Sequence, residues 1–519
     1  MQQFLLITLG GVSALLVCLS QVSLWQRKEY RFDRMKAHLL SPEGAPSKEW
    51  FVIVQGVFLL LAWMSRFELF AVASILSIVL GHSLRIYRKG VMRPDFTTRA
   101  ILVFAATGIF GLVVFLLIVP FMINALFLAT CIFVLPLLIA LSVFVVGIPA
   151  QLQKQKTISR AKSFRAHLKN LAVVGITGSV GKTSTKTYLV HLLGGESETI
   201  VATSEHRNSP YSVAQDMLSR ISQQTKIYIA EMGAYVSGEI KELADLTMPS
   251  VAVITAITNQ HVALFGSLEA LARTKWELVD SLPEHGVAIL NKDDAQIIEQ
   301  AIGFKKKMFW FSLHGQADVY TTDILMQQDC IVCTIHIGKE KQDVRLPVIS
   351  RGQLVPVIAA VTAAHALGSD FLSIMKRLAT LPQLPRTMEV CKGIAGSTLI
   401  DDSYSASEAS VTNAIEYLRN SPITDTRLIL VPIIELGDEG KVVHERIGAL
   451  LANLPARVFI YGHAYKDDIL RGLGSSKIAT VTWHTDTQDM QQEIMKNVTS
   501  KTRIVLEGRI PKNIRTALL

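Results

Sequence analysis

Hydrophobic residues are distributed unevenly along this chain of 519 residues. Before residue 150 they form long, nearly continuous runs, whereas the later apolar runs are short and alternate with polar segments. An apolar run of about 20 residues is long enough to cross a bilayer as a helix. The pattern therefore predicts an α-helical membrane domain over residues 1–150, with about five spans. The predicted spans are residues 3–24, 50–65, 67–84, 99–119 and 122–148.

Basic residues predict how these helices are oriented. Lys and Arg gather in the loops 25–49 and 85–98 and in the stretch after residue 150, while the intervening turns hold only Arg66. Because positively charged loops stay on the cytoplasmic side, we expect a multi-pass protein of the inner membrane with its N-terminus outside and everything after residue 150 in the cytoplasm. The first span lacks a basic n-region and a clear cleavage site, which favours an uncleaved helix. No charged residue lies deep within a predicted span, and this favours an anchor over a transporter.

The composition excludes some classes of protein. Half of the residues are hydrophobic, the mean hydropathy is +0.35 and the net charge is +9. Much of that positive charge lies in the loops beside the apolar segments, so it indicates membrane topology rather than a nucleic-acid partner. Five cysteines do not make a disulfide framework. Cys330 and Cys333 form a CxxC pair, but the run around them is more typical of a strand than of a metal or redox site.

After residue 150 the pattern changes to alternating strands and helices. Strand-like apolar runs alternate with helical segments through residues 168–300, which predicts a mainly parallel sheet. Residues 395–510 repeat this alternation as a smaller α/β unit. A chain of this length is too long for a single core, so the membrane part and two α/β parts are a natural division.

Residues 171–190 read LAVVGITGSVGKTSTKTYLV, a buried strand followed by a glycine-rich turn and a helix. Glycines let backbone N–H groups approach an anion, and the N-terminus of the helix adds its dipole. The strict P-loop pattern has glycine where this chain has Ile176, yet strand, GKT and helix follow in order. Lys182 is expected to reach the β- and γ-phosphates of a nucleotide, and the Thr183 hydroxyl to bind Mg²⁺. The expected nucleotide-binding residues of this turn are Gly178, Ser179, Val180, Gly181, Lys182, Thr183 and Ser184.

The variant turn GITGSVGKTSTK resembles that of the Mur ligase family, in particular the branch that adds D-alanyl-D-alanine to peptidoglycan precursors. Further motifs follow in the family's order over residues 168–519. They are AEMGAYVSGEI (230–240), AVITAITNQHVALFGSLEALARTKWEL (252–278), GVAILNKDD (286–294), LPRTMEV (384–390), LIDDSYSASEASVTNAIEYL (399–418) and IIELGDEGKVVHERIG (433–448). The resemblance implies a P-loop central ATP-binding domain over residues 151–380 and a C-terminal α/β domain over residues 381–519.

The resemblance also implies roles for individual residues. Glu231 follows the strand 226–230, at the end of a strand where open α/β sheets bind ligands, and a carboxylate there can hold Mg²⁺. His261 follows the next strand and would be a second metal contact. Lys275 matches the family lysine that is carbamylated to place a carboxylate on a second Mg²⁺. Lys182, His261 and Lys275 are therefore the expected catalytic residues, and Thr183, Glu231, His261 and Lys275 the expected metal site.

Four further positions match nucleotide contacts of the family. Asn208 would belong to the nucleotide or metal shell, and Asn291 would lie on the adenosine side. Arg386 and Asp402 would contact ATP from the C-terminal domain as it closes. Loop capping and solvated charge are the alternative interpretation of Arg386 and Asp402.

These features predict an ATP-dependent acid–amino-acid ligase. A carboxylate is a poor electrophile, so ATP would first phosphorylate it, and an amine would then attack the acyl phosphate. Lys182 and two cations would neutralise the charge of the transferring phosphoryl group. The resemblance implies addition of an amino acid or dipeptide to a peptidoglycan-type precursor, small or lipid-linked, at the cytoplasmic membrane face.

Three departures from the family pattern concern the substrate. The membrane helices stand in place of the N-terminal domain that grips a uridine nucleotide in the family. The family's DSYNANP is Asp402-Ser-Tyr-Ser-Ala-Ser-Glu408 here, and its GxHNxxN helix start is Ser350-Arg-Gly-Gln-Leu-Val-Pro356. Two alternatives follow: a Mur-like ligase for a different carboxylate, such as a polyglutamate-like one, and a membrane ATPase without ligase activity.

Overall fold

A computed structural model describes most of the chain in two compact units, Met1–Lys156 and Thr157–Leu519. Each unit is described by itself below. The residues described are 2–28, 30–40, 50–65, 68–89, 94–118, 125–259, 262–433, 436, 439–475 and 478–519.

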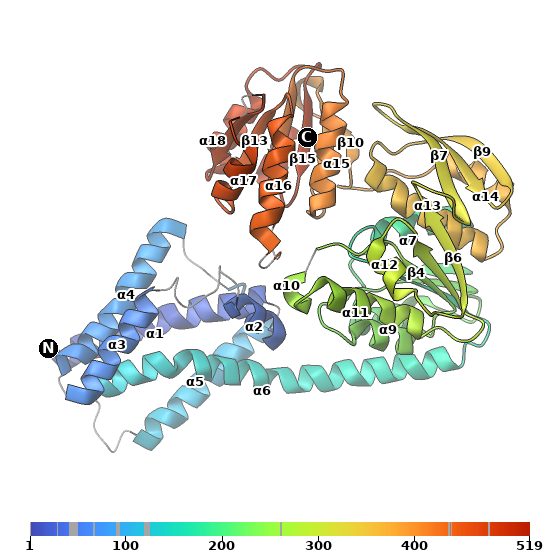
Figure 1. Ribbon diagram of the computed structural model, residues 1–519. Helices are drawn as coiled ribbons and strands as arrows, with labels where there is room; N and C mark the ends of the chain where they lie inside the picture. The colour runs from blue at the N-terminus through green and yellow to red at the C-terminus, as the bar shows by residue number, and fades with distance from the viewer. Residues whose placement is uncertain are drawn as a thin grey trace. The chain divides into compact units, whose positions relative to one another are not determined.

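Over its described residues the first unit has helices joined by turns and no strand (Figure 1). Each of the five predicted apolar segments forms a helix, and a short helix, α2, follows the first of them. The helices are α1 (Gln2–Arg27), α2 (Phe32–Leu40), α3 (Trp50–Ser65), α4 (Glu68–Lys89), α5 (Thr98–Ile118) and α6 (Ala125–Ala166). Small and branched side chains, among them Ala71, Ile75 and Ala129, pack between these helices in one buried cluster.

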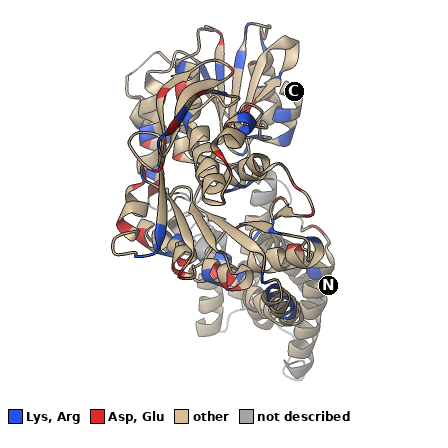
Figure 2. Cartoon of the chain, turned by 90° about the vertical axis from the view of Figure 1, so that its right-hand side faces the viewer, with Lys and Arg blue, Asp and Glu red and all other residues tan. Residues whose placement is uncertain are grey.

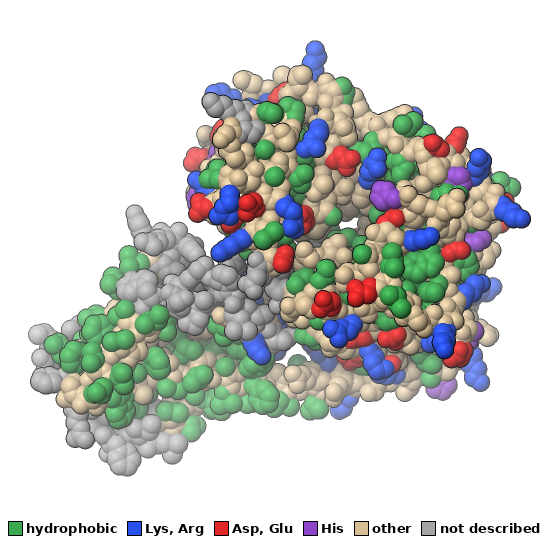
Figure 3. Space-filling view, in the orientation of Figure 1, with side chains coloured by type: hydrophobic (Ala, Val, Ile, Leu, Met, Phe, Trp, Pro, Cys, Tyr) green, Lys and Arg blue, Asp and Glu red, His purple; other side chains and the backbone are tan. Residues whose placement is uncertain are grey.

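Two of these helical segments, Thr8–Arg27 and Ala125–Ala166, have the length and composition of a membrane span. The apolar segments in the other three helices are shorter, 10–17 residues each. Large hydrophobic side chains are also exposed: Trp63 is 60% and Leu137 70% accessible. Figure 3 shows hydrophobic side chains over much of the visible surface of this unit. Length and composition alone are weak evidence of a span, so a five-span topology remains a prediction.

Helix α6 continues beyond its apolar part into the second unit, where its last turn is held by a buried arginine. Arg165 donates hydrogen bonds to the carbonyl oxygens of Thr247 (2.7 Å), Leu168 (2.7 Å), Leu171 (3.1 Å) and Met248 (3.3 Å). These carbonyls end a helix or lie in turns, and the guanidinium supplies the donors that they would otherwise lack.

The second unit begins with a nine-stranded sheet, in the order β2-β3-β1-β4-β5-β6-β7-β8-β9. Neighbours from β2 to β7 pair in parallel, and β7, β8 and β9 form an antiparallel extension. The strands are β1 (Ala172–Thr177), β2 (Ile200–Ala202), β3 (Ile227–Glu231), β4 (Val251–Ile254), β5 (Val287–Asn291), β6 (Lys307–Ser312), β7 (Val319–Met326), β8 (Ile331–Ile337) and β9 (Glu340–Leu346).

Both faces of this sheet are buried because side chains of a strand alternate between faces. In β1, Val174 joins one hydrophobic cluster and Val173 joins the other. Helices α7 and α13 cover the first face, and α8, α9 and α11 contribute to the second cluster. The helices of this domain are α7 (Lys182–Leu193), α8 (Pro210–Arg220), α9 (Glu239–Thr247), α10 (Val262–Phe265), α11 (Leu268–Asp280), α12 (Ala295–Gln300), α13 (Arg351–Ala366) and α14 (Phe371–Leu378).

A second sheet of six strands follows, in the order β10-β11-β15-β12-β13-β14. Only β10 is antiparallel to its neighbour, so the expectation of mainly parallel α/β structure is confirmed for both sheets. The strands are β10 (Glu389–Lys392), β11 (Thr398–Asp402), β12 (Thr426–Leu430), β13 (Arg457–Tyr461), β14 (Thr480–His484) and β15 (Arg503–Glu507). The helical elements are η3 (Ile394–Gly396), α15 (Glu408–Arg419), α16 (Gly440–Ala452), α17 (Lys466–Leu473), α18 (Thr487–Met495) and α19 (Lys512–Leu518).

Charged residues of both signs are interspersed over the strands and helices of this second unit (Figure 2). The CxxC pair lies at and within β8, as the interpretation of that run as a strand predicts. Both thiols are buried, Cys333 in the hydrophobic core and Cys330 against the side-chain oxygen of Gln327 at 3.1 Å.

Candidate functional site

The turn between β1 and α7 has the backbone of a phosphate-binding loop. Gly178 (φ +148°) and Gly181 (φ +79°) both adopt conformations that side chains disfavour, and Gly181 precedes the first residue of α7. A Cβ at position 178 would lie 2.1 Å from the Thr255 hydroxyl, so no other residue fits there. The glycines therefore let the chain turn tightly at the N-terminus of α7, where backbone N–H groups are free to bind an anion.

This loop is fastened to the end of the neighbouring strand β4. The Ser179 N–H donates to the Ala256 carbonyl at 2.7 Å, and the Thr258 N–H donates to the Ser179 hydroxyl at 3.0 Å. The Thr255 hydroxyl donates to the Val180 carbonyl at 2.5 Å. These bonds fix the loop in shape, so binding a phosphate there requires little reorganisation of the backbone.

Lys182 folds back over the loop that precedes it. Its Nζ donates to the carbonyl oxygens of Gly178 (2.8 Å) and Ser179 (3.0 Å). Burial lowers the pKa of Lys182, and the charge of Glu231 partly offsets this effect. The ammonium therefore lies beside the loop with neutral carbonyls as its hydrogen-bond partners, which an anionic phosphate can replace. Ser184, also predicted in this turn, is buried in the first turn of α7.

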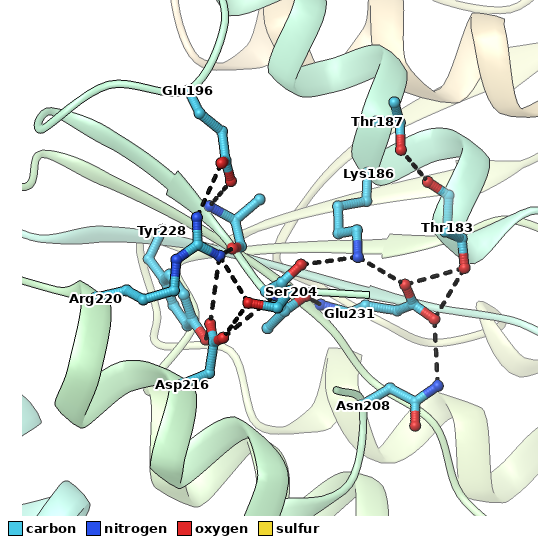
Figure 4. Close-up of polar contacts among 12 residues, drawn as sticks. Thr183, Lys186, Thr187, Glu196, Ser204, Asn208, Asp216, Arg220, Tyr228 and Glu231 are labelled. Carbon is cyan, nitrogen blue, oxygen red and sulfur yellow. Dashed lines mark hydrogen bonds and ion pairs between the residues drawn. The ribbon is translucent and has the colours of Figure 1, made fainter. Parts of the chain in front are cut away.

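Glu231 is the centre of a compact polar cluster (Figure 4). It ends β3, directly beside Ile176 of β1. The Thr183 hydroxyl lies 3.1 and 3.0 Å from the two carboxylate oxygens, and the Lys186 Nζ lies 3.1 Å from Oε2. The Asn208 amide donates to Oε1 at 3.2 Å. The structure thus brings the side chains of Glu231, Thr183 and Asn208 together.

The electrostatics keep this carboxylate ionised although it is only 4% exposed. Burial alone raises the pKa of Glu231, but the charges of Lys186 and Lys182 and the hydrogen bonds outweigh it, so its pKa lies below the ordinary value. Mg²⁺ prefers oxygen ligands such as those of carboxylates and hydroxyls, and it takes few protein ligands. The pair Glu231 and Thr183 therefore fits a magnesium ion.

Asn208 is held by a second polar network that Figure 4 shows beside the first. In the loop that carries Asn208, the Ser204 hydroxyl donates to Asp216 at 2.6 Å. Arg220 connects this loop to Glu196, with 2.9 Å between the guanidinium and the carboxylate. The Asn208 carbonyl accepts from the Gly233 N–H at 2.8 Å, which ties its backbone to the residues after β3.

Lys275 lies on α11 with only 4% of its surface exposed. Burial, with a contribution from the charge of Lys182, lowers the pKa of Lys275 to about 7. Its ammonium group lies 6.0 Å from the centre of the Phe265 ring and makes no hydrogen bond or ion pair with the residues that the structure describes. An amine in this setting has a substantial neutral, nucleophilic fraction at neutral pH.

Asn291 ends β5 and is 4% exposed. Its amide donates to the Thr255 carbonyl at 2.9 Å, and its side-chain oxygen accepts from the Asp293 N–H at 2.9 Å. The first contact supports the segment after β4 that fastens the phosphate-binding turn, and the second stabilises the turn after β5. His261, the predicted second metal contact, lies outside the described residues.

The two predicted residues of the C-terminal domain have local partners. Arg386 (φ +59°) donates from Nε to the Ser403 hydroxyl at 3.1 Å and from Nη2 to the Ser403 carbonyl. Asp402, 6% exposed, accepts from the Met388 N–H at 3.2 Å and faces Glu507 of β15. These contacts match the loop-capping alternative for Arg386, while burial raises the pKa of Asp402 to about 7.

Two residues that the sequence does not single out also belong to this site. Lys186 lies one turn after Lys182 on α7, and the four-residue spacing is the signal that places both on one helix face. Tyr404, two residues after Asp402, interacts through its hydroxyl with Thr183. Its ring stacks on His206 with centroids 6.0 Å apart and 9° between the planes. Among the described residues no cluster of three or more His, Cys, Asp or Glu could hold a metal by itself.

Comparison with known proteins shows which family and which enzymes this chain is similar to. Residues 176–364 match the Mur ligase middle domain. A UDP-N-acetylmuramoyl-tripeptide–D-alanyl-D-alanine ligase of Escherichia coli is 30% identical over 53% of this chain and 61% of its own length. The enzyme of that name from Bacillus subtilis is 28% identical over 66% of this chain and 74% of its own length. The ligase of this name from Mycobacterium bovis is 29% identical, and the match spans 58% of its length.

Solved structures agree in fold. MurF from Acinetobacter baumannii matches with a TM-score of 0.63 and 23% identity over 70% of this chain and 80% of that one. MurF from Thermotoga maritima, solved in complex with ADP, matches with a TM-score of 0.61 and 24% identity over 70% and 81%. Residues 176–364 therefore match the Mur ligase middle domain, and over 70% of its length the chain shares the fold of those solved structures.

Proposed function

From the Mur ligase middle domain and the Thr183–Glu231–Lys182 cluster within it, we propose that this chain is an ATP-dependent, Mg²⁺-requiring ligase. It joins a carboxylate to an amine through an acyl phosphate, adding an amino acid or dipeptide to a peptidoglycan-type precursor at the cytoplasmic face of the membrane. The observation that carries the proposal is the convergence of a phosphate-binding turn, a hydroxyl and an ionised carboxylate on one point (Figure 4).

ATP would bind with its phosphates in the turn of residues 178–181. Lys182 would exchange the carbonyls of Gly178 and Ser179 for phosphate oxygens, which are better partners because they carry charge. Thr183 and Glu231 would hold Mg²⁺, which when bound neutralises charge on the transferring phosphoryl group. Lys186 keeps Glu231 ionised, so the carboxylate is ready for a cation.

The reaction has two steps. A carboxylate oxygen of the substrate attacks the γ-phosphorus, the bond to ADP breaks, and an acyl phosphate forms. The amine then attacks the acyl carbon, phosphate leaves, and the amine gives up a proton as the amide bond forms. Lys182 would stabilise the charge that spreads over the phosphoryl oxygens in the first step.

Lys275 is proposed as a carbamylated residue. Its pKa of about 7 leaves a substantial neutral fraction near pH 7. That amine would attack CO₂, form an N–C bond and lose a proton, which replaces a cation by a carboxylate close to Lys182. The new carboxylate, with His261, would provide ligands for a second Mg²⁺. Burial of Lys275 without a partner among the described residues supports this assignment.

The C-terminal domain would complete the ATP site. Asn208 would remain in the metal shell, Asn291 would lie on the adenosine side, and Arg386 and Asp402 would reach ATP when the domain closes. The interaction of Tyr404 with Thr183 supports this proposal, because it brings the loop after β11 against the phosphate-binding turn. Closure would exclude water, which otherwise hydrolyses the acyl phosphate.

Membrane attachment through the N-terminal helices is part of the proposal. The apolar helices, their exposed hydrophobic side chains and the basic loops support a multi-pass anchor with the ligase domains in the cytoplasm. These helices precede the middle domain where the family's uridine-binding domain is expected, and this favours a lipid-linked precursor as one candidate acceptor. The same feature supports a second candidate function, ligation of a different carboxylate such as a polyglutamate-like one.

The test is an acceptor-dependence assay on the full chain in detergent or nanodiscs. ATP, Mg²⁺ and mixed amino acids and dipeptides are supplied with a membrane extract, and amide products are identified by mass spectrometry. We expect ATP turnover to rise with acceptor and a new amide product to form, both lost in Lys182→Ala. Lys241→Ala, an exposed lysine of the same domain, is the matched control. ATP hydrolysis that is equally fast without acceptor and yields no amide would contradict ligation and favour a membrane ATPase.

A further inference from the structure

A cavity of about 280 Å³ lies among the helix ends of the first unit. Three of its lining residues are cations from three separate parts of the chain: Arg31 just before α2, Arg99 in the first turn of α5, and Lys154 on α6. Gln151 adds a polar group, and none of the lining residues that the structure describes is acidic. The described lining therefore carries positive charge and has several hydrogen-bond donors.

Arg99 is the best-defined part of this cavity. Its guanidinium carbon lies 4.4 Å from the centre of the Tyr30 ring, so the aromatic face fixes the side chain in position. Its Nε atom is buried and has no hydrogen-bond partner among the described residues, an arrangement that costs free energy unless something else accepts the bond. The guanidinium lies at the cavity, which Gly147 of α6 also lines, 3.8 Å from where a Cβ at that position would be. A buried donor beside open space indicates an acceptor that enters from outside.

Apolar rings border the cavity on one side. Phe32 lines it and is 48% exposed. Phe32 also packs edge-on against Trp25 of α1, with ring centroids 4.8 Å apart, and against Phe144 of α6 at 6.4 Å. A ligand that fits both parts of this site has an anionic group for the cations and an apolar part that follows the aromatic rings.

The predicted membrane topology gives a separate indication of where these cations lie, at the cytoplasmic side of the membrane. The loops after the first span, before the fourth span and after the fifth span are the three basic regions expected on the cytoplasmic side. In the part of the chain that the structure describes, Arg31, Arg99 and Lys154, which lie in or next to these regions, line one cavity. Gln26 of α1 also forms two hydrogen bonds with the backbone of Asp95 before α5, at 2.8 and 3.0 Å. The cavity therefore lies where lipid headgroups would be found.

We propose that this cavity binds the phosphate group of a membrane lipid. The planar guanidinium of Arg99 can donate two parallel bonds to phosphate oxygens, while Lys154 adds a second positive charge. Basic pockets at the cytoplasmic ends of membrane helices are suited to anionic headgroups. A volume of about 280 Å³ accommodates a headgroup but is at the small end for a whole ligand. The acyl chains would remain outside, along the aromatic rings.

The experiment uses the full chain in detergent, titrated with dioleoyl phosphatidate or with dioleoyl phosphatidylcholine and followed by native mass spectrometry. We expect phosphatidate to be retained in preference to phosphatidylcholine. Lys154→Gln and Arg99→Gln should each weaken phosphatidate binding by about tenfold, because each removes one charge at the headgroup. Lys156→Gln is the matched control: Lys156 is exposed on the same helix two residues away, and it does not line the cavity.

A competition arm separates the two possible sources of phosphate. Millimolar inorganic phosphate should leave phosphatidate binding unchanged if the apolar part of the lipid contributes to recognition. Displacement of the lipid by free phosphate at that concentration would overturn the assignment to a lipid and indicate a soluble anion. If Lys154→Gln and Lys156→Gln weakened phosphatidate binding equally, the cavity would not be the binding site. Such a result would indicate diffuse electrostatic attraction by the basic part of the helix.

Folding is controlled separately. Lys154 is exposed, so its substitution leaves packing intact, and Arg99→Lys keeps the charge if Arg99→Gln fails to fold. Arg99→Lys is expected to bind phosphatidate more weakly than the wild type but better than Arg99→Gln. This assay contains no ATP and no acceptor, so its failure would leave the proposed ligase function standing, and the reverse also holds.

Discussion

Two buried carboxyl sites occupy equivalent places in the two α/β domains but have opposite electrostatics. Glu231 ends β3 of the nine-stranded sheet, and Asp402 and Glu507 end neighbouring strands β11 and β15 of the six-stranded sheet. The charges of Lys186 and Lys182 hold the pKa of Glu231 below its ordinary value. In the second site burial raises the pKa of Asp402 to about 7, and burial with the charge of Asp402 raises that of Glu507.

The contrast shows that position in the fold alone does not determine what a carboxylate can do. Ligands generally bind at the carboxyl ends of parallel strands, and both sites lie there. The surrounding side chains decide the charge: Glu231 has two lysines, a hydroxyl and an amide around it, whereas Asp402 and Glu507 face each other. The first arrangement is suited to holding a cation, and the second to sharing a proton.

The largest effect on ATP turnover is expected when the ionised carboxylate of Glu231 is replaced by a neutral side chain. Glu231→Gln removes the carboxylate that would hold Mg²⁺, so ATP turnover should fall by about 10²–10³-fold. The substitution also leaves Lys186 buried without its partner, which should cost several kcal/mol of stability, about 3–5. Steady-state ATP turnover and thermal unfolding of the same preparation measure the two effects.

Asp245→Asn is the control for this substitution, since Asp245 is an exposed carboxylate of the same domain. It should change neither turnover nor stability appreciably, because exposed ion pairs contribute little. Normal ATP turnover in a folded Glu231→Gln protein would remove Glu231 from the catalytic site and with it the distinction drawn between the two carboxyl sites.

A smaller but still large effect is expected at Lys275. Its pKa of about 7 means that the ammonium form dominates at lower pH, so carbamylation and activity should decline as the pH falls through 7. Removing CO₂ from the buffer should lower activity, and added bicarbonate should restore it. Lys275→Ala should reduce ATP turnover by about 10–100-fold and abolish the response to bicarbonate. A wild-type enzyme indifferent to CO₂ at pH 6.5 would contradict carbamylation.

The two regions also differ in how far the sequence predicts them. The phosphate-binding turn is predictable because its glycines, Lys182 and Thr183 are adjacent in sequence and their spacing determines their geometry. The pairing of Glu231 with Thr183 follows from strand ends meeting at one sheet edge. In contrast, the pairing of Asp402 with Glu507 depends on the order of strands, since these residues lie over 100 positions apart and only the register of β11 with β15 joins them.

Contacts between the two α/β domains could not be predicted from local sequence patterns either. Tyr404 and His206 lie on different domains, and nothing in either segment indicates that their rings stack. The helical unit shows the same division: apolar runs predict its helices, whereas the cavity around Arg99 depends on how helix ends pack. Sites formed by residues close in sequence can thus be predicted from residue spacing, whereas contacts between distant segments require the structure.

At the site of Asp402 and Glu507, the expected effect is on the pH dependence of stability rather than on ATP turnover. Asp402 has a pKa of about 7 when folded and an ordinary value of 3.8, so from about pH 4 to pH 7 the unfolded chain holds fewer protons than the folded one. Stability should therefore fall as the pH rises through this window and level off above it. Burial and the charge of Asp402 also raise the pKa of Glu507, so this carboxyl adds to the fall. Glu507→Gln removes that contribution, so the loss of Tm between pH 5 and pH 8 should shrink by about 2–4 °C.

The matched comparison for that change is Glu231→Gln, whose carboxylate has a lowered pKa and should leave the Tm difference between pH 5 and pH 8 almost unaltered. If Glu507→Gln and the wild type lose the same Tm between these pH values, Asp402 and Glu507 do not share a proton, and the contrast between the two sites fails.

The smallest effect is expected where the two domains touch. The Tyr404 hydroxyl interacts with Thr183, the residue proposed to bind Mg²⁺, so it competes with the metal or helps to position the hydroxyl. Tyr404→Phe keeps the ring stacked on His206 and removes only the hydroxyl, whose interaction with Thr183 is worth at most about 1 kcal/mol. A competing role predicts a lower KM for Mg·ATP by about fivefold at unchanged kcat, whereas a positioning role predicts a lower kcat. Because ATP has to reach Thr183 beneath this contact, we expect the fall in KM. His206→Ala, which removes the stacking partner but keeps the hydroxyl, is the control, and identical kinetics in Tyr404→Phe and the wild type would make the contact irrelevant to nucleotide binding.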